Sequence, residues 1–309
     1  MTAASTLQAR LEAGEFVITA EVKPPQNTDA GVIRRKAALL KGAIHAANVT
    51  DNQTAVVRMS SVAASRLLVD EGLEPILQMT CRDRNRIAIQ SDLLGAHALG
   101  IRNVLALSGD HQSFGDHGRA ANVFDLDSVQ LVQAIRRLSD TGKLIGGTAI
   151  DGECRWFVGA VENPFADPRA IRVPRLAKKV AAGAQFVQTQ CIFNLDQFET
   201  FMEGVRARGL HEQVHVLAGV TPLRSLKMAQ IMATRVPGID LPDAVLARMA
   251  AVPKDVKGGQ KAEGVRIAVE TLQRLRRVPG VHGVHLMAIE WEEIVPELLR
   301  SAGLLPPGP

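Results

Sequence analysis

The chain has 309 residues and 46% of them are hydrophobic, which suits one large domain with a sizeable core. The net charge of +4 is modest, the basic residues are scattered and only 4% of the residues are aromatic, so nucleic acid is not expected as a partner. The apolar runs are short and interrupted, and the first residues lack the pattern of a secretory signal peptide, so neither a membrane span nor secretion is expected.

Eight apolar runs of strand length recur along the chain, and the longer segments between them carry apolar residues at helical spacing. These runs are 16–22, 43–49, 74–80, 103–107, 157–161, 186–190, 214–219 and 283–288. Glycines near the ends of the intervening segments, as in "HALGIRNVLAL", are typical of helix C-caps. Eight strand–helix units predict an α/β fold, a single (β/α)8 barrel of the TIM type over residues 1–309.

An open, doubly wound sheet is the alternative fold, although no GxGxxG motif follows the first expected strand, which argues against a nucleotide-binding Rossmann domain. Two stretches interrupt the regular alternation. Residues about 109–124 form a long polar, glycine-rich loop after the fourth strand, and loops of this length are typically functional or mobile. Residues about 236–265 form an insertion with a short helix of its own.

Three cysteines, Cys81, Cys154 and Cys191, are spread through the chain, and none belongs to a CxxC pair. This spacing supports neither a disulfide framework nor a self-contained zinc site, so no metal site is predicted. Unpaired cysteines are among the most often buried residues, and these three are expected to be small core residues. A cytoplasmic location is the corresponding expectation.

Three polar residues stand at or just past the ends of expected strands: Glu21 in "TAEVKPP", Asp110 in "LALSGD" and Gln190 in "FVQTQ". In a parallel strand–helix protein these strand ends converge on one mouth. Two carboxylates and an amide there predict an enzyme with a small, polar, ring-shaped substrate. The structural alternatives are a surface glutamate paired with a lysine, a turn aspartate after Gly109, and a glutamine that bonds the loop backbone.

Eight short motifs follow one another over roughly residues 16–304: "TAEVKPPQNTD", "NVTDNQTA", "LQMTCRDRN", "LALSGD", "FDLDSVQLV", "LAKKVAAGA", "TQCIFN" and "GVTPLRS". Their order resembles that of the compact bacterial and archaeal methylenetetrahydrofolate reductases. The resemblance implies an oxidoreductase of one-carbon metabolism and methionine biosynthesis. It would reduce 5,10-methylenetetrahydrofolate to 5-methyltetrahydrofolate with hydride from a reduced flavin, FAD or alternatively FMN.

The same resemblance implies roles for individual residues. Glu21 matches the family's catalytic acid, and Asp110 matches a carboxylate near flavin and folate that is counted as catalytic and substrate-binding. Gln190 and Thr50 match substrate-binding positions, since an amide offers the donor and the acceptor that a pterin edge requires. The implied cofactor-binding residues are Thr50, Gln78, Ser108, Gly109, Asp110, Phe124, Asp125, Arg175, Lys178 and Lys179.

The chain also departs from the family pattern. Ser108 stands where many relatives have arginine, and Gln78 where many have histidine. Leu226 replaces the aromatic residue that stacks on nicotinamide in NADH-using relatives, and Phe124 replaces a tyrosine. The ending "HLMAIEWEEIVPELL" is most similar to that of relatives that use a partner subunit, and Trp291 within it belongs either to an interface or to the core.

Three functions are therefore expected as alternatives. The first is a flavin-dependent reductase, similar to the folate-binding subunit of a partner-dependent enzyme, with NAD(P)H or an iron–sulfur partner subunit as electron donor. The second is a flavin-independent, NADH-dependent reductase of the same substrate. The third is a non-catalytic folate-binding barrel, against which the two retained carboxylates argue. A homo-oligomer or hetero-oligomer is expected in each case.

Overall fold

The structure, a computed structural model, describes residues 3–253, 256–288 and 290–305. Its centre is a closed barrel of eight parallel strands in the order β1 to β8, as the sequence predicts. The strands are β1 Val17–Val22, β2 Ala46–Val49, β3 Pro75–Thr80, β4 Asn103–Leu107, β5 Phe157–Glu162, β6 Phe186–Cys191, β7 His215–Val220 and β8 Val281–Leu286. A single (β/α)8 barrel is confirmed, and the open sheet is excluded because β8 pairs with β1.

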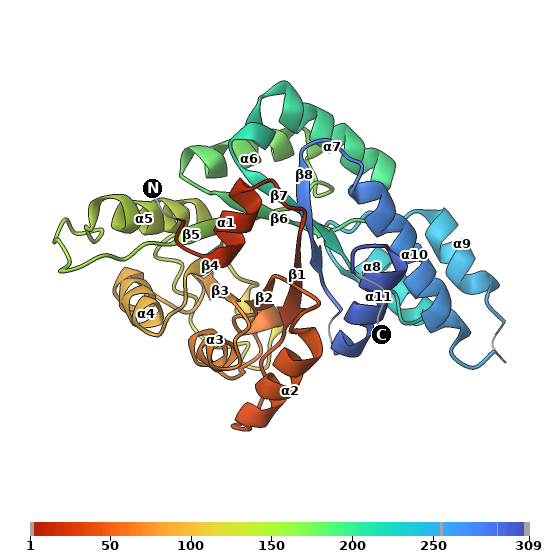
Figure 1. Ribbon diagram of the computed structural model, residues 1–309, viewed down its shortest axis with the longest axis horizontal. Helices are drawn as coiled ribbons and strands as arrows, with labels where there is room; N and C mark the ends of the chain where they lie inside the picture. Colours follow the sequence, from red (N-terminus) through yellow and green to blue (C-terminus); the bar gives the residue numbers. More distant parts are fainter. Residues whose placement is uncertain (1–2, 254–255, 289, 306–309) are drawn as a thin grey trace.

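Helices surround the barrel (Figure 1). They are α1 Thr6–Glu12, α2 Ala30–Leu40, α3 Ser61–Asp70, α4 Arg86–Ala98, α5 Ser128–Thr141, α6 Arg172–Ala181, α7 Leu195–Ala207, α8 Leu226–Arg235, α9 Asp243–Ala251, α10 Gly259–Leu275 and α11 Val295–Ser301. Short 3₁₀ turns are η1 Gln53–Ala55, η2 Gln112–Phe114, η3 Arg169–Ile171, η4 Leu210–Glu212 and η5 Glu292–Ile294. Among the described residues, no helix has the length and apolar character needed to cross a membrane.

Apolar side chains fill the barrel near the amino ends of the strands. This inner cluster contains Phe157 and Phe186, whose rings stack with their centroids 4.9 Å apart. Gly159 makes room for them, because a Cβ at this position would lie 2.2 Å from the Phe186 ring. Leu7 and Leu11 of α1 pack into the same cluster, so this helix closes that end of the barrel.

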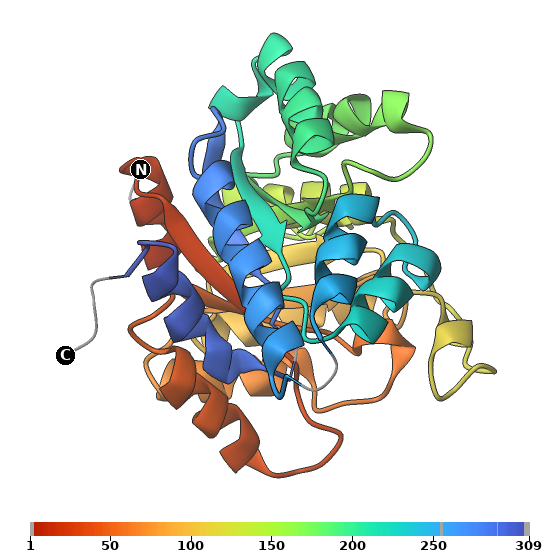
Figure 2. The same ribbon diagram turned by 90° about the vertical axis from the view of Figure 1, so that its right-hand side faces the viewer.

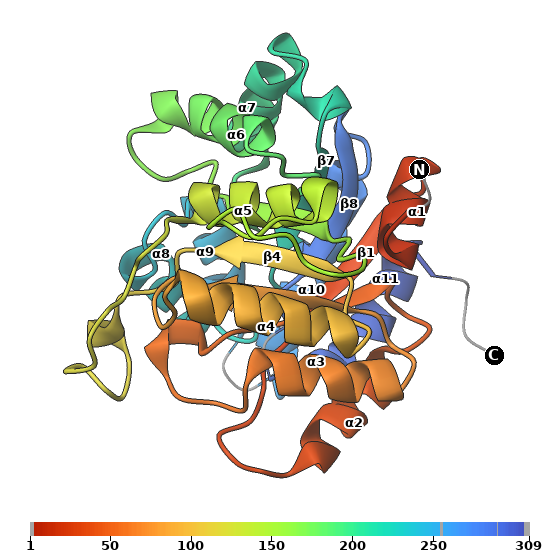
Figure 3. The same ribbon diagram turned by 90° about the vertical axis from the view of Figure 1, so that its left-hand side faces the viewer.

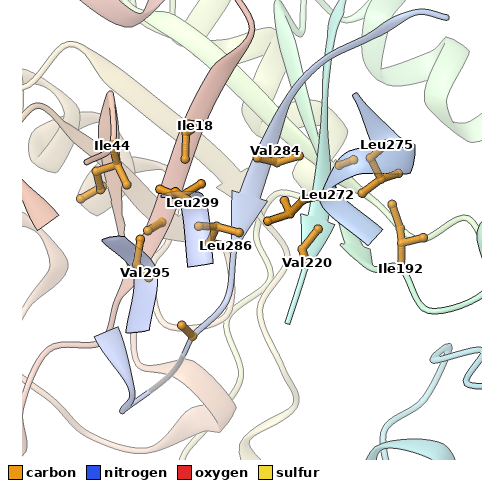
Figure 4. Packing of buried hydrophobic residues seen from close by; sticks show 14 of the residues in the cluster. Ile18, Ile44, Ile192, Val220, Leu272, Leu275, Val284, Leu286, Val295 and Leu299 are labelled. Atoms are coloured by element: carbon orange, nitrogen blue, oxygen red, sulfur yellow. The ribbon is translucent and has the colours of Figure 1, made fainter. Parts of the chain in front are cut away.

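A second apolar layer lies between the barrel and its helices. Figure 4 shows part of it, where Leu286 of β8 packs close to Val295 and Leu299 of α11. Helix α5 shows how the sequence builds this layer: Leu131, Ile135 and Leu138 recur at helical spacing and are all buried. Asp127 begins the helix with a capping box, and Gly142 ends it in a left-handed conformation.

The expected insertion at about 236–265 contains α9 and the start of α10, and residues 254–255 within it lie outside the described range. Figure 2 shows α9 between α8 and α10. Met249 of α9 and Ile267 of α10 join Leu226 and Phe193 in a small apolar cluster. The insertion therefore packs on the barrel near the end of β6.

Loop 109–124 extends from the carboxyl end of β4, at the side of the molecule opposite both termini (Figure 3). Because all eight strands are parallel, this is the end where their carboxyl termini meet.

Histidine rings accept backbone hydrogen bonds near the amino ends of the strands. His45 Nδ1 accepts from the Ile18 N–H at 2.8 Å, and His282 Nδ1 accepts from the Val216 N–H at 3.2 Å. Burial lowers the pKa of His45, and burial with the neighbouring His215 lowers the pKa of His282 to about 4. These rings are therefore neutral in the folded protein at neutral pH.

We expect the stability to fall as the pH drops from 6.5 toward 4. In this window the unfolded chain, whose histidine pKa is 6.5, binds more protons than the folded chain, so protonation favours unfolding. The lowered pKa of His282 alone should reduce the free energy of unfolding by about 1–2 kcal/mol across this window. The reduction is no larger because water reaches part of the ring and screens its charge. Urea midpoints at pH 7.5, 6.0 and 4.5 test this, and His282→Asn should show the flatter pH dependence. Parallel curves for the two proteins would contradict it.

Candidate active site at the carboxyl ends of the strands

Glu21, at the end of β1, is a carboxyl group buried in the barrel mouth, with only 6% of its surface exposed. Gln53 Nε2 donates a hydrogen bond to Glu21 Oε1 at 2.9 Å. His285 Nε2 of β8 lies 3.9 Å from Glu21 Oε2. Neither contact is with a lysine, so the alternative of a surface glutamate paired with a lysine does not describe Glu21.

A layer of buried polar side chains lies directly beneath Glu21. Thr19 precedes Glu21 by two residues and so faces the same side of β1. Its hydroxyl lies 3.0 Å from His285 Nδ1 and accepts from Gln188 Nε2 at 3.4 Å. The amides of Asn48 and Gln188 bond each other twice, at 2.6 and 3.0 Å. These mutual bonds satisfy polar groups that would be costly to bury unpaired, and they fix the floor of the mouth.

The turn after β2 has an unusual backbone. Asn52, Thr54 and Ala55 have φ angles of 45°, 57° and 57°. Such angles are uncommon outside glycine and exceptional for a β-branched threonine, and each typically costs about 1–3 kcal/mol. Asp110 Oδ2 accepts from the Thr54 N–H at 3.0 Å, and Gly115 fits against Ala55, since a Cβ on Gly115 would lie 1.8 Å from the Ala55 oxygen. Loop 109–124 thus holds this turn in place.

Asp110 itself is exposed, and so is Ser108, while Gly109 between them has a φ of 91°. The end of β3 lies close to residue 109 and also favours glycine there, because a Cβ would lie 3.1 Å from Thr80 Cβ. Asp110 is therefore a turn residue after Gly109 in its backbone, as the structural alternative has it, but its carboxylate also contacts the turn after β2.

Thr50 and Asp51 follow β2 directly and are both buried. The Thr50 hydroxyl is enclosed and has no hydrogen-bond partner among the described residues, which is uncommon for a buried polar group. Asp51 is fully engaged: Oδ2 accepts from the Thr80 N–H at 2.9 Å and from Arg84 Nη1 at 2.6 Å. Asp51 therefore builds the wall of the mouth, and Thr50 lies buried beside it.

Gln190 is half-buried at the end of β6, where the register with β7 shifts. Its Oε1 accepts from the Cys191 N–H at 3.0 Å, so its amide nitrogen remains available to a ligand. The Cys191 thiol lies 2.8 Å from the Thr221 hydroxyl, and burial raises its pKa to about 12. Cys81 and Cys154 are also free and buried, as the sequence predicts.

The positions expected to bind a cofactor are divided around the mouth. Gln78 is half-buried in β3. Phe124 has a φ of 40° and an exposed ring, and its backbone N–H donates a hydrogen bond to the Cys81 carbonyl. Asp125 is paired with Arg86 through two hydrogen bonds of 2.7 and 2.8 Å, which lower the pKa of this carboxyl to about 2. Asp125 therefore anchors the start of α4.

Helix α6 carries the three expected basic residues. Arg175 and Lys178 are exposed, whereas Lys179 is buried and lies 2.8 Å from Glu162 Oε2 at the end of β5. Burial lowers the pKa of Lys179, although Glu162 opposes this shift. Arg175 and Lys178 are thus accessible to an anion, and the Lys179 charge is already paired.

Two further expectations concern residues outside the mouth's centre. Trp291 is only 7% exposed and packs in the main core cluster, which favours its structural alternative over an interface; Ile289 in the same segment lies outside the described residues. No group of three or more potential metal-ligating side chains occurs among the described residues.

The strand-end pattern predicted Glu21, Asp110 and Gln190 at one end of the barrel, and the family resemblance added Thr50; all four lie at or just past the carboxyl ends of their strands. The sequence pattern did not indicate Gln53 and His285, whose side chains lie 2.9 and 3.9 Å from the Glu21 carboxyl oxygens. His285 had a signal that could have been used, because it stands two residues after Gly283 on β8 and so faces the same side, the barrel interior. Gln53 had none, since it belongs to a turn without a repeating pattern.

These features define a class of protein: a (β/α)8 barrel with an acidic and amide-rich site where its strands end. A family model described as methylenetetrahydrofolate reductase matches residues 6–303, and the chain belongs to the methylenetetrahydrofolate reductase family. The resemblance found in the sequence is therefore confirmed.

The chain matches part of the length of its curated relatives. Methylenetetrahydrofolate reductase 2 of Schizosaccharomyces pombe is 29% identical over 74% of this chain, but the match spans only 36% of the relative. The 5,10-methylenetetrahydrofolate reductase of Pectobacterium carotovorum is 24% identical over 76% of this chain and 72% of the relative. The chain therefore spans little more than a third of the yeast relative and most of the bacterial one.

One similar solved structure has a TM-score of 0.63 and covers 97% of both chains at 14% identity. It is an uncharacterised protein from Clostridium thermocellum that binds two copies of 5-methyl-5,6,7,8-tetrahydrofolic acid. At this identity the likeness concerns the fold alone.

Proposed function

We propose that this barrel reduces 5,10-methylenetetrahydrofolate to 5-methyltetrahydrofolate, with hydride supplied by a reduced flavin and a proton supplied by Glu21. The observation that carries the proposal is the placement of Glu21, a nearly buried carboxyl at the family's expected acid position, above a fixed polar floor. Family membership and the reaction named for the relatives support it.

The chemistry explains why a buried carboxyl is useful here. Opening the five-membered ring of the substrate leaves a nitrogen that needs a proton and a carbon that carries positive charge. Glu21 would donate the proton, and Asp110 would stabilise the positive charge as an anion near the mouth. The amide nitrogen of Gln190, which has no hydrogen-bond partner among the described residues, would hold a polar edge of the substrate.

A bound flavin, FAD or FMN, would supply a two-electron hydride donor that no amino-acid side chain provides. The residues fit such a group in part. Thr50, Gln78, Ser108, Gly109 and Phe124 lie around the same mouth, and Arg175 and Lys178 are accessible to phosphate. Lys179 and Asp125 would support the site through their ion pairs with Glu162 and Arg86 rather than by direct contact.

The pairing of Lys179 gives weight to a second candidate, a flavin-independent reductase in which NADH gives hydride directly to folate. Relatives named as NADH and NADPH reductases occur in Arabidopsis thaliana and Caenorhabditis elegans. Leu226, at the start of α8, packs in the small cluster with Met249, so an aromatic platform for nicotinamide is not available at this residue. For the flavin enzyme, the missing platform favours electron delivery by a partner subunit, in a cytoplasmic oligomer, over direct reduction by NADH.

We expect the purified protein to show flavin absorption bands that bleach when 5-methyltetrahydrofolate is added without oxygen. The reaction is then running in reverse, with electrons passing from the methyl-folate to the flavin. NADH is added to a separate anaerobic sample with oxidised flavin, and its failure to reduce the flavin would indicate a partner subunit as donor. A colourless protein that neither FAD nor FMN converts to an active form would contradict the flavin proposal.

A further inference from the structure

We propose that Gln53 is a positioning residue of this site, whose side-chain amide holds the Glu21 carboxyl group in both its protonated and its ionised state. The inference rests on the proposed function only in assigning the proton donor's role to Glu21. The contact itself is a hydrogen bond of 2.9 Å between Gln53 Nε2 and Glu21 Oε1.

A primary amide is suited to this task because it has a donor and an acceptor on one planar group. Its N–H bonds an ionised carboxylate, and after rotation by half a turn its oxygen accepts from a protonated carboxyl. A lysine in the same place would favour the ionised form alone, and a second carboxylate would favour the protonated form. A group that gives up and regains a proton in each turnover therefore keeps one partner throughout.

The backbone around Gln53 supports a dedicated placement. Gln53 lies between Asn52 and Thr54, both in the left-handed region, and this turn is held by the bond from the Thr54 N–H to Asp110 Oδ2. The Gly115 backbone also fits against Ala55, where any larger residue would collide. The same turn thus contacts both carboxylates of the mouth, one through a side chain and the other through the backbone.

Other groups near Glu21 cannot replace this contact. His285 Nε2 of β8 is 3.9 Å from Glu21 Oε2, beyond hydrogen-bond distance, and its other nitrogen faces Thr19. The Cys191 thiol of β6 also lies close enough for the charge of Glu21 to raise its pKa, but the thiol contacts Thr221 and Met287 instead. Among the described residues, Gln53 alone makes a direct side-chain hydrogen bond to Glu21.

The test compares Gln53→Met, Gln53→Lys and Gln53→Glu with the wild type in the pH profile of kcat. Met keeps the length and removes the bonds, and we expect kcat to fall about tenfold with KM changed less than about threefold. Lys should move the alkaline limb of the profile about one pH unit lower, and Glu should move it about one pH unit higher. Gln230→Met, an exposed change of the same type on α8, is the matched control and should behave as wild type.

A second readout does not depend on turnover. Infrared difference spectra show the carboxyl band of Glu21, which is assigned by its loss in Glu21→Gln. The midpoint pH of this band should be lower in Gln53→Lys and higher in Gln53→Glu than in the wild type. Opposite displacements in folded variants support the proposal, and coincident titration curves in all variants overturn it. If the wild type has no reductase activity, the proposed function fails while the infrared titration still decides the role of Gln53.

Discussion

Replacing Glu21 with glutamine is expected to lower kcat for the reduction of 5,10-methylenetetrahydrofolate by about 10²–10⁴-fold. Glutamine keeps the size of the side chain and its hydrogen-bonding capacity, so Gln53 can still contact it, but an amide cannot serve as the proton donor. Binding should survive, because the polar floor of Thr19, Gln188 and His285 does not depend on the charge of Glu21. The expected signature is a fall in kcat and kcat/KM together, with KM nearly unchanged.

Steady-state kinetics and calorimetric binding of 5-methyltetrahydrofolate measure the two effects separately. The control is Glu290→Gln, which alters a glutamate near the same mouth that is exposed and pairs with Lys23. This variant should keep its activity within about threefold, since exposed pairs contribute little. Equal loss of binding and turnover in Glu21→Gln would assign Glu21 to the architecture of the site rather than to proton transfer.

The sequence predicted the barrel because two repeating signals agree along the whole chain. Buried parallel strands are nearly continuous apolar runs, and helices such as α5 show apolar residues at helical spacing between a capping box and a terminal glycine. The strand ends then follow from the topology, which is why the positions of Glu21 and Gln190 along the chain suffice to place both at one mouth. The expected start of β2 was three residues early, because turn residues before a strand can also be apolar, and that of β8 was two residues late.

The contacts among side chains could not be predicted in the same way. Lys179 resembled a phosphate ligand in its motif, but its partner Glu162 is fixed by the packing of α6 on the end of β5. Gln53 lies in a turn whose left-handed residues, Asn52 and Thr54, carry no glycine signal. The placement of Gln53 depends on contacts of its turn with loop 109–124, which is distant in the sequence and has no periodic pattern.

The second large effect is expected for stability rather than for turnover. Asp51 is buried behind the mouth, where it bonds Arg84 and the backbone and hydroxyl of Thr80. Removing one partner of a buried ion pair leaves the other charge without compensation, and Arg84 retains only the more exposed Asp92. Asp51→Ala should therefore lower the free energy of unfolding by about 3–5 kcal/mol.

Urea denaturation followed by both circular dichroism and fluorescence measures this loss, provided that the two transitions coincide. The matched control is Asp70→Ala, which breaks an aspartate–arginine pair with Arg66 on the surface of α3 and should cost less than about 1 kcal/mol. The contrast separates burial from charge, because both variants remove an aspartate that pairs with an arginine. Equal losses in the two variants would mean that the wall of the mouth is stabilised by its apolar packing and not by the Asp51–Arg84 pair.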